Sequence, residues 1–265
     1  MKKKLLSLSV LIIIFLTSLF LGKLYFAICM CLFATLSLRE ILNIRPKDKR
    51  TPIEIEILSY VIVVFFVMNN YDKSNIYYFL DYRLIASLIF IDLIPLVLVG
   101  ERRKYNLINA LYLMGSSLFI GATFNLIVQF REYNLDYVTY IFLIALCTDA
   151  FCFITGKLIG QHSLTTISPK KTLEGALGGV FMGTFVPSLF YMSTIAVHEP
   201  VYVIFLITFF LSTLGQIGDL VFSYIKREFG KKDFSNMVIG NGGILDTIDS
   251  LIFITLGLLL VLSII

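Results

Sequence analysis

The chain has 265 residues, of which 58% are hydrophobic and only 15% are charged, with a formal net charge of +4. A water-soluble domain of this length needs more charged surface, so the composition excludes an ordinary soluble protein. The small net charge says little by itself, and the placement of the cations along the chain is more informative.

Apolar runs of about twenty residues recur along the chain, and this length lets a helix cross the hydrocarbon core of a bilayer. An open sheet would leave backbone groups unpaired in lipid, and the runs lack the alternation typical of an outer-membrane barrel. We therefore expect an all-α, polytopic integral membrane protein. About nine transmembrane helices are predicted, at residues 5–21, 24–43, 53–68, 84–99, 107–130, 137–158, 172–197, 200–222 and 249–265.

Most cationic residues fall on one side of the membrane if these spans simply alternate. The opposite side receives only Lys23, Lys73, Arg83 and Arg131. Because cytoplasmic loops are enriched in Lys and Arg, the rich side is predicted to be cytoplasmic, with the N-terminus inside. Its cations are Lys2, Lys3, Lys4, Arg45, Lys47, Lys49, Arg50, Arg102, Arg103, Lys104, Lys157, Lys170, Lys171, Lys226, Arg227, Lys231 and Lys232.

The start of the chain resembles a signal peptide, but its apolar run is long and no small-residue cleavage site follows, so we interpret it as an uncleaved first span. We divide the chain into N-terminal spans, 1–135, and a C-terminal catalytic region, 136–265. The catalytic region would carry cytoplasmic loops at 157–172 and 223–248.

The first four spans contain few residues that indicate chemistry. Asp92 is the exception, because an acid inside a membrane is costly and often functional. Pro95 could kink the same helix, so a structural role for Asp92 stays equally open. Arg39 and Glu40 close the second span and are interpreted as an interfacial anchor. The cysteines lie in apolar runs and are interpreted as small hydrophobic residues, Cys29, Cys31, Cys147 and Cys152.

The sixth span contains a carboxylate, Asp149, and leads into a polar segment at 156–175 that reads GKLIGQHSLTTISPKKTLEG. A lone carboxylate in a membrane costs several kcal/mol unless it is paired, metal-bound or hydrated. An interhelical hydrogen bond from a protonated Asp149 is the alternative to a functional role. Lys170 and Lys171 precede the next helix, whose free N-terminal amides favour anionic oxygens. A plain positive-inside loop is the alternative there.

A second polar segment, 223–249, reads SYIKREFGKKDFSNMVIGNGGILDTID and lies between two apolar runs. Asp219 and Ser223 share a helix face if the eighth span continues, and Asp246 and Asp249 would share a face of the last span. Mg²⁺ prefers such oxygen ligands and takes one or two carboxylates together with substrate phosphates. The glycines at 240–243 supply amides that can approach a phosphate closely. The pattern predicts metal-assisted phosphate chemistry at the cytosolic face.

These residues resemble the membrane phosphatidate cytidylyltransferases, or CDP-diacylglycerol synthases. Ser168 to Gly175 is similar to the family's Ser-Pro-Lys-Lys-Thr-x-Glu-Gly motif, without a gap. The C-terminal signature departs from the family pattern at Asn241, where the family has His, at Thr247, where it has Arg, and at Ile239, where it has Pro. It is otherwise kept by Gly218, Asp219, Leu220, Ser223, Lys226, Arg227, Lys232, Asp233, Ser235, Gly240, Gly242, Gly243, Asp246 and Asp249.

The resemblance implies transfer of CMP from CTP to phosphatidic acid, giving CDP-diacylglycerol and pyrophosphate. It further implies Mg²⁺, a second cation such as K⁺, and a homodimer in a bacterial cell membrane, with the active site facing the cytoplasm and no nucleic-acid partner. We assign metal binding to Asp219, Asp246, Asp249 and Asp149, and catalysis to Asp219, Lys226, Arg227 and Asp246. Substrate binding is assigned to Ser168, Lys170, Lys171, Thr172, Glu174, Ser223, Lys232, Asn241, Gly242 and Gly243.

Two alternatives stay open. One is the same reaction on another lipid phosphate, isoprenoid or polyprenyl, because the chain departs from the family pattern at Asn241 and Thr247. The other is a membrane transporter that uses Asp92 and Asp149 as ion or proton sites.

Overall fold

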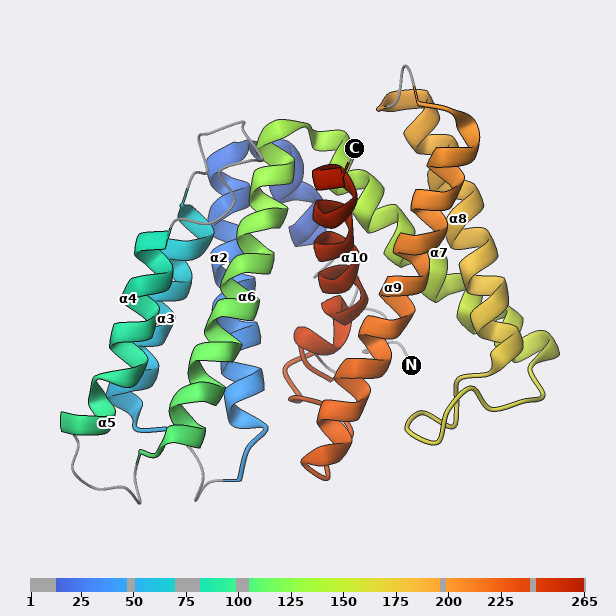
Figure 1. Ribbon diagram of the computed structural model, residues 1–265. Coiled ribbons are helices and arrows are strands. Elements are labelled where there is room, and N and C mark those ends of the chain that lie inside the picture. Colours follow the sequence, from blue (N-terminus) through green and yellow to red (C-terminus); the bar gives the residue numbers. More distant parts are fainter. Residues whose placement is uncertain are drawn as a thin grey trace. The chain divides into compact units, whose positions relative to one another are not determined.

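The computed structural model describes residues 13–46, 51–69, 82–98, 105–195, 199–238 and 242–264. Within these ranges the chain forms the helices labelled α2 to α10 in Figure 1, a further helical stretch at 13–21, and no strand beyond isolated bridges. The all-helical prediction is confirmed for this part of the chain. The helices are α2 Lys23–Asn43, α3 Ile53–Met68, α4 Tyr82–Leu93, α5 Pro95–Leu98, α6 Leu107–Tyr133, α7 Leu135–Ile159, α8 Leu173–Thr194, α9 Val201–Glu228 and α10 Leu245–Ile264.

Six of the described helices, α2 and α6 to α10, are long and apolar enough to cross a membrane. The predicted span at 84–99 is divided, because α4 ends at Leu93 and α5 begins at Pro95. Proline has no backbone N–H and disturbs the preceding turn, which explains the break. The predicted span at 53–68 coincides with α3, whose 16 residues fall just short of the roughly 17 that a membrane crossing needs. The count of nine spans stays a prediction.

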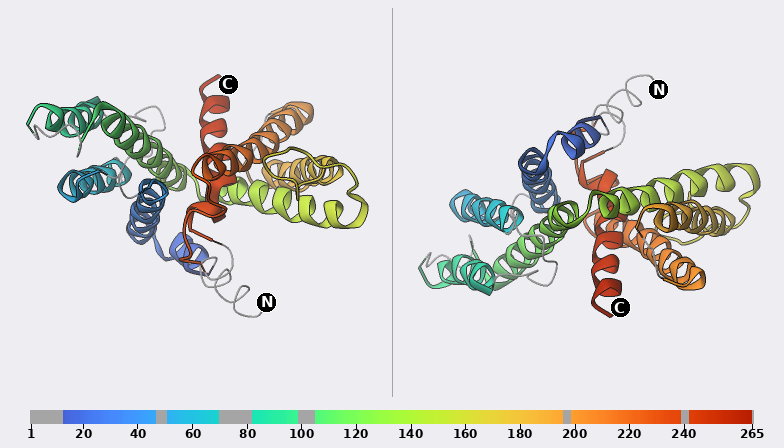
Figure 2. Two further views of the ribbon diagram at one scale, coloured as in Figure 1. Left: turned by 90° about the horizontal axis from the view of Figure 1, so that it is seen from below. Right: turned by 90° about the horizontal axis from the view of Figure 1, so that it is seen from above.

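The chain consists of two compact units, which we describe separately. The first unit contains Met1–Tyr133 and Asp233–Thr247, and the second contains Asn134–Lys232 and Ile248–Ile265. In the first unit α2, α3, α4 and α6 pack side by side, as both views of Figure 2 show. The division proposed from the sequence, at 135, was drawn on the location of the polar motifs rather than on packing, and it stays a prediction.

Some buried polar side chains of the first unit hydrogen-bond to backbone carbonyls or to other side chains, whereas Asp92 Oδ2 has no hydrogen-bond partner among the described residues. Asn125 Nδ2 donates to the carbonyls of Phe66 and Asn69 at 2.7 and 2.8 Å, where α3 ends. Asp92 is fully buried, and its Oδ1 accepts a hydrogen bond of 3.0 Å from the Ser59 hydroxyl. The Tyr105 hydroxyl donates to the Asp92 carbonyl at 2.7 Å, just before the break at Pro95. These contacts favour the structural role that the sequence left open for Asp92.

The second unit depends on close packing between α7 and α8. Gly175, Gly179 and Gly183 recur every four residues and face α7. A Cβ added at Gly179 would lie 2.1 Å from Cys152 Sγ, and one at Gly183 would lie 2.1 Å from Thr148 Oγ1. Small residues at this spacing let membrane helices approach closely. The contact brings the polar end of α7 against the first turns of α8.

Helix α9 packs in the second unit through hydroxyl contacts with α7, and α10 from Ile248 onward belongs to the same unit. The Tyr140 and Thr208 hydroxyls lie 2.7 Å apart, and so do those of Thr148 and Ser212. All four cysteines are free thiols, and all except the half-buried Cys152 are buried, which confirms their interpretation as hydrophobic residues.

Candidate active site

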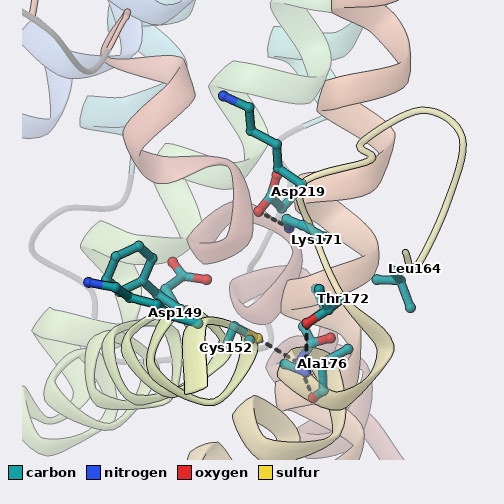
Figure 3. Close-up of a pocket in the computed structure, with 13 residues that line it drawn as sticks. Asp149, Cys152, Leu164, Lys171, Thr172, Ala176 and Asp219 are labelled. Atoms are coloured by element: carbon teal, nitrogen blue, oxygen red, sulfur yellow. Dashed lines mark hydrogen bonds and ion pairs between the residues drawn. The ribbon is translucent and has the colours of Figure 1, made fainter. Parts of the chain in front are cut away.

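A cavity of about 350 Å³ opens at one end of the second unit, where α7, α8 and α9 meet the loop between α7 and α8 (Figure 3). It joins acids and lysines that are far apart in the sequence. Its lining residues are Asp149, Cys152, Phe153, Gly156, Lys157, Leu164, Lys170, Lys171, Thr172, Gly175, Ala176, Gln216 and Asp219. The mixture of cations, carboxylates and small residues can accommodate a charged ligand.

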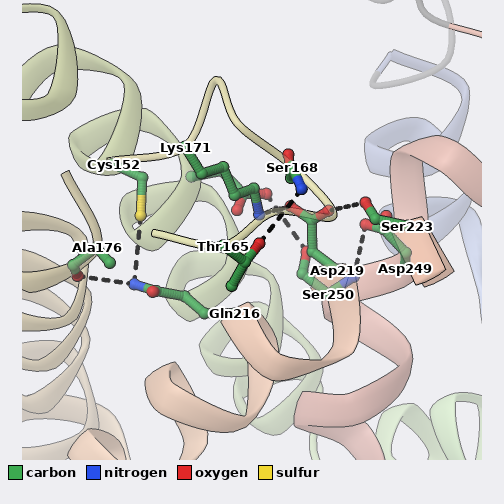
Figure 4. Close-up of polar contacts among 11 residues, drawn as sticks. Cys152, Thr165, Ser168, Lys171, Ala176, Gln216, Asp219, Ser223, Asp249 and Ser250 are labelled. Carbon is green, nitrogen blue, oxygen red and sulfur yellow. Dashed lines mark hydrogen bonds and ion pairs between the residues drawn. The ribbon is translucent and has the colours of Figure 1, made fainter. Parts of the chain in front are cut away.

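An ion pair between Lys171 and Asp219 connects the loop to α9 across this cavity (Figures 3 and 4). Lys171 Nζ contacts Asp219 Oδ2, and the Ser223 hydroxyl donates to Asp219 Oδ1 at 3.4 Å. Because α9 continues to Glu228, Ser223 lies one turn beyond Asp219 on the same face, as its spacing predicted. Lys171 and Asp219 are both partly accessible, so a phosphate can compete for the lysine.

The loop itself is fixed by residues at the start of α8. Thr172 caps the helix, since its hydroxyl accepts the Gly175 N–H at 3.1 Å. Glu174 Oε2 accepts the Gln161 N–H at 3.1 Å, and Glu174 Oε1 lies 2.6 Å from His162 Nδ1. Glu174, predicted to bind substrate, therefore holds the loop in this structure and does not line the cavity.

The two remaining predicted residues of the loop lie near its tip. The Ser168 N–H donates to the Thr165 hydroxyl at 3.2 Å, and the Ser168 carbonyl accepts the Lys171 N–H at 3.0 Å (Figure 4). Lys170 is exposed at the edge of the cavity. These bonds close a tight turn around Pro169, which presents Lys170 and Lys171 one after the other.

Asp219 of this ion pair forms a cluster of three acids in the second unit with Asp149 and Asp249. Asp249 is 6% exposed and lies in the electrostatic field of Asp219, Lys226 and Asp149. Ser250 joins two of the acids, since its N–H donates to Asp249 Oδ1 at 2.8 Å and its hydroxyl donates to Asp149 Oδ2 at 3.3 Å (Figure 4). Ser250 was not identified from the sequence, because a serine in the first turns of an apolar helix gives no signal.

The acids of this cluster lie among several cations. Lys171 pairs with Asp219, Lys226 acts on Asp249 and is only 8% exposed, and Lys157 and Lys170 line the same cavity. This mixture of acids and cations can bind an anionic ligand together with its counter-cation. Carboxylate oxygens suit Mg²⁺, which takes one or two of them and completes its coordination with waters and phosphates. Among the described residues no group of three or more His, Cys, Asp or Glu side chains could hold a metal ion, and the binding of Mg²⁺ stays a prediction.

The other cations predicted to act in catalysis or binding lie at the end of α9. Arg227 is exposed and its Nη1 donates to the Lys231 carbonyl at 3.1 Å. Lys232 is exposed as well, and it is the last residue of segment Asn134–Lys232 of the second unit. Neither side chain lines the cavity.

Asp246 lies in the first turn of α10, within segment 233–247 of the first unit. Its Oδ2 accepts the N–H groups of Phe234 and Gly243, at 2.9 and 2.7 Å. Gly242 has a φ of +94°, a conformation that favours glycine, and a Cβ there would lie 2.6 Å from Asp246 Oδ2. The Gly242 N–H donates to the Val238 carbonyl at 3.2 Å. Asp246 thus closes the glycine turn in this structure, and its proposed metal role stays a prediction.

Asn241 and Gly240 lie outside the described residues. The interpretation of Glu40 as an interfacial anchor is wrong, because its side chain is 2% exposed and accepts hydrogen bonds from Ser235, Ile244 and Leu245. A carboxylate at the end of an apolar run gives no local indication of partners some two hundred residues away in the chain.

Comparison with known proteins identifies the class. Residues 2–265 match the model of the Cytidylyltransferase family, and the chain therefore belongs to this family. The resemblance seen in the two motifs is confirmed, and it extends over the N-terminal spans as well.

Individual relatives carry a more specific name. The chain is 34% identical over 256 residues to a phosphatidate cytidylyltransferase of Staphylococcus epidermidis, and the comparison covers 96% of each protein. A phosphatidate cytidylyltransferase of Staphylococcus saprophyticus is also 34% identical, and one of Staphylococcus aureus is 32% identical, with the same coverage.

Proposed function

We propose that the chain transfers CMP from CTP to phosphatidic acid and releases pyrophosphate. Family membership and the names of the relatives support the reaction type. The observation that carries the assignment is the cavity of the second unit, where the loop lysines and the acids of α7 and α9 line one volume. A nucleotide triphosphate and its cations need such a combination of charges.

In the proposed reaction, an oxygen of the lipid phosphate attacks the α-phosphorus of CTP. The new P–O bond forms as the bond between the α-phosphorus and the bridging oxygen breaks, and pyrophosphate leaves with the bonding electrons. The nucleophile is already an anion, so no side chain has to remove a proton from it. Positioning and charge neutralisation therefore provide most of the catalysis.

We assign the positioning role mainly to the loop between α7 and α8. Lys170 and Lys171 would hold phosphate oxygens, with Lys171 exchanging Asp219 for the substrate. Ser168 and Thr172 would add hydrogen bonds at the same edge. Lys226 would keep the acids of the cluster partly neutralised, and the exposed Arg227 and Lys232 would attract the nucleotide from solution.

We propose that Mg²⁺ binds at Asp219 with Asp149 or Asp249, and that Asp246 contributes as the sequence predicts. When bound, the ion would neutralise charge on the CTP phosphates. A second cation such as K⁺, and a homodimer, are proposed on the family resemblance alone.

The membrane arrangement is also proposed. Nine spans with a cytoplasmic N-terminus would place both polar loops, 157–172 and 223–248, at the cytoplasmic face of a bacterial cell membrane. CTP could then arrive from water and the lipid from the leaflet. The six long apolar helices and the placement of cations along the chain support this topology.

A different lipid phosphate is the second candidate substrate. Thr247 stands where the family carries Arg, and its hydroxyl donates to the Gly243 carbonyl at 3.1 Å rather than presenting a cation. The transporter alternative loses its basis, because the chain belongs to a cytidylyltransferase family and Asp92 is held by structural contacts.

The test is pyrophosphate release by the purified protein from CTP and Mg²⁺, with phosphatidic acid, an isoprenoid ether-lipid phosphate or a polyprenyl phosphate. We expect turnover with phosphatidic acid, and strongly reduced but measurable turnover in Asp219→Asn. Asp136→Asn changes an acid of the same unit that does not line the cavity, and it should retain activity. Absence of turnover with every lipid would refute the proposed function, and turnover only with a prenyl lipid would replace the substrate.

A further inference from the structure

Glu40, at the last turn of α2, reaches the loop that precedes α10. Its Oε1 accepts a hydrogen bond of 2.6 Å from the Ser235 hydroxyl and one of 2.9 Å from the Ile244 N–H. Its Oε2 accepts the Leu245 N–H at 2.8 Å. All three donors belong to segment 233–247, so one buried side chain of α2 holds both ends of that segment.

These contacts provide hydrogen-bond acceptors for backbone N–H groups at the start of α10. The first amides of a helix have no partner within the helix, and a nearby residue of the chain usually accepts one of them through its side chain. Ile244 precedes α10 and has no acceptor in its side chain. Glu40, 204 positions earlier, supplies the acceptor instead, and its negative charge suits the positive end of the helix.

The dependence is mutual. A carboxylate buried without donors is strongly unfavourable, so Glu40 can occupy its position only while the loop is in place. Gly243 packs directly on it, since a Cβ there would lie 2.4 Å from Glu40 Oε2. Gly243 also donates its N–H to Asp246 at 2.7 Å. The position of Glu40 therefore restricts the position of Gly243, and through it that of Asp246.

We propose that Glu40 is a positioning residue for the reaction: from α2 it fixes segment 233–247, which contains Gly242, Gly243 and, in the first turn of α10, Asp246. Its effect on the loop follows from the contacts alone. Its effect on turnover rests on the proposed function, in which Asp246 contributes to the Mg²⁺ site that would neutralise the CTP phosphates. Through this one side chain, helix α2 takes part in the reaction.

The first test measures hydrogen exchange of the full-length protein in detergent, followed by mass spectrometry, for the wild type and Glu40→Gln. Glutamine has the same size but replaces one acceptor oxygen by an NH₂ donor, which faces donors from the loop. We expect exchange in peptides covering 233–246 to rise at least tenfold, while peptides within 251–264 stay unchanged. Unchanged exchange in 233–246 would overturn the proposal.

Glu132→Gln is the matched control. Glu132 is also a buried acid of the first unit, 5% exposed, and it pairs with Lys23 at 2.6 Å, not with the loop. Its substitution should leave exchange in 233–246 at the wild-type value. If both variants loosen the loop equally, the effect is general destabilisation and the proposal fails.

The second test measures pyrophosphate release at saturating Mg²⁺. In Glu40→Gln we expect the KM for CTP to rise at least fivefold and the KM for phosphatidic acid to change less than twofold. A loss of folded molecules would lower kcat without altering either KM, so an unchanged KM for CTP would refute a positioning role in turnover. If the wild type shows no turnover, the proposed function fails, while hydrogen exchange still decides the role of Glu40 in the loop.

Ser235→Ala keeps the proposal testable if Glu40→Gln does not fold. It removes one of the three donors from the loop side and leaves α2 unchanged. We expect a smaller rise in exchange over 233–246, at least threefold, and wild-type exchange there would contradict the proposal.

Discussion

Removal of the Lys171 side chain tests the central contact of the proposed site. Lys171→Met deletes the ammonium that pairs with Asp219 and keeps the apolar part of the side chain. Hydrogen bonds to charged groups contribute about 1.5–3 kcal/mol. Because each 1.36 kcal/mol is a factor of ten in rate, a lost phosphate contact corresponds to a decrease in kcat/KM of roughly 10- to 150-fold.

Solvent access to the two side chains makes the expected decrease in kcat/KM smaller. The Lys171 side chain is 31% exposed and that of Asp219 is 24% exposed, so water screens both charges. We therefore expect the lower part of the range, a decrease of roughly 10- to 50-fold. The assay is pyrophosphate release with varied CTP, and Lys231→Met, which removes a lysine that does not line the cavity, serves as the control.

A double-mutant cycle separates the two possible roles of Lys171. If Lys171 only neutralises Asp219, its substitution should have no further effect once Asp219 is Asn. If it also contacts a phosphate, Lys171→Met should still lower the residual kcat/KM of Asp219→Asn. Wild-type kcat/KM in Lys171→Met itself would refute the assignment of this cavity as the CTP site.

Three further predictions concern helix packing, backbone geometry and the role of Asp92. Gly179→Ala should lower the free energy of unfolding by about 1–3 kcal/mol, since its Cβ would lie 2.1 Å from a sulfur atom of α7, whereas Gly115→Ala, with open space around it, should not. A thermal melt in detergent checks both. Gly242→Ala should abolish most turnover, because φ is +94° and the new Cβ would displace Asp246; activity near that of the wild type would contradict the proposed loop geometry. Asp92→Asn keeps an acceptor for α3 and should retain turnover, and its inactivation would return a functional role to Asp92.

The sequence was sufficient where the signal is local. Apolar runs predicted the helices, and the spacing of Asp219 and Ser223 placed them on one face of α9. The motif at 168–175 identified the loop that brings Lys171 to the cavity. In each case neighbouring residues in the chain determine the result, so helical periodicity and turn chemistry are enough.

Contacts between distant segments were not predictable in this way. Glu40 was misinterpreted because its partners, Ser235 and Leu245, are about two hundred residues away in sequence. Ser250, which joins two acids of the cluster, is one serine among many in apolar helices. The two backbone amides that Asp246 accepts were not predictable either, because they depend on how the chain turns at Gly242 and Gly243.

The division of the chain into two units determines which fragments could fold when they are expressed separately. The polypeptide passes from one unit to the other at 133/134, at 232/233 and again at 247/248. A fragment that stops after Tyr133 would lack all three donors for the Glu40 carboxylate, and a fragment starting at Asn134 would carry 233–247 without the acid that secures it. We therefore expect the two halves to be insoluble or inactive when expressed singly and to regain function only on co-expression.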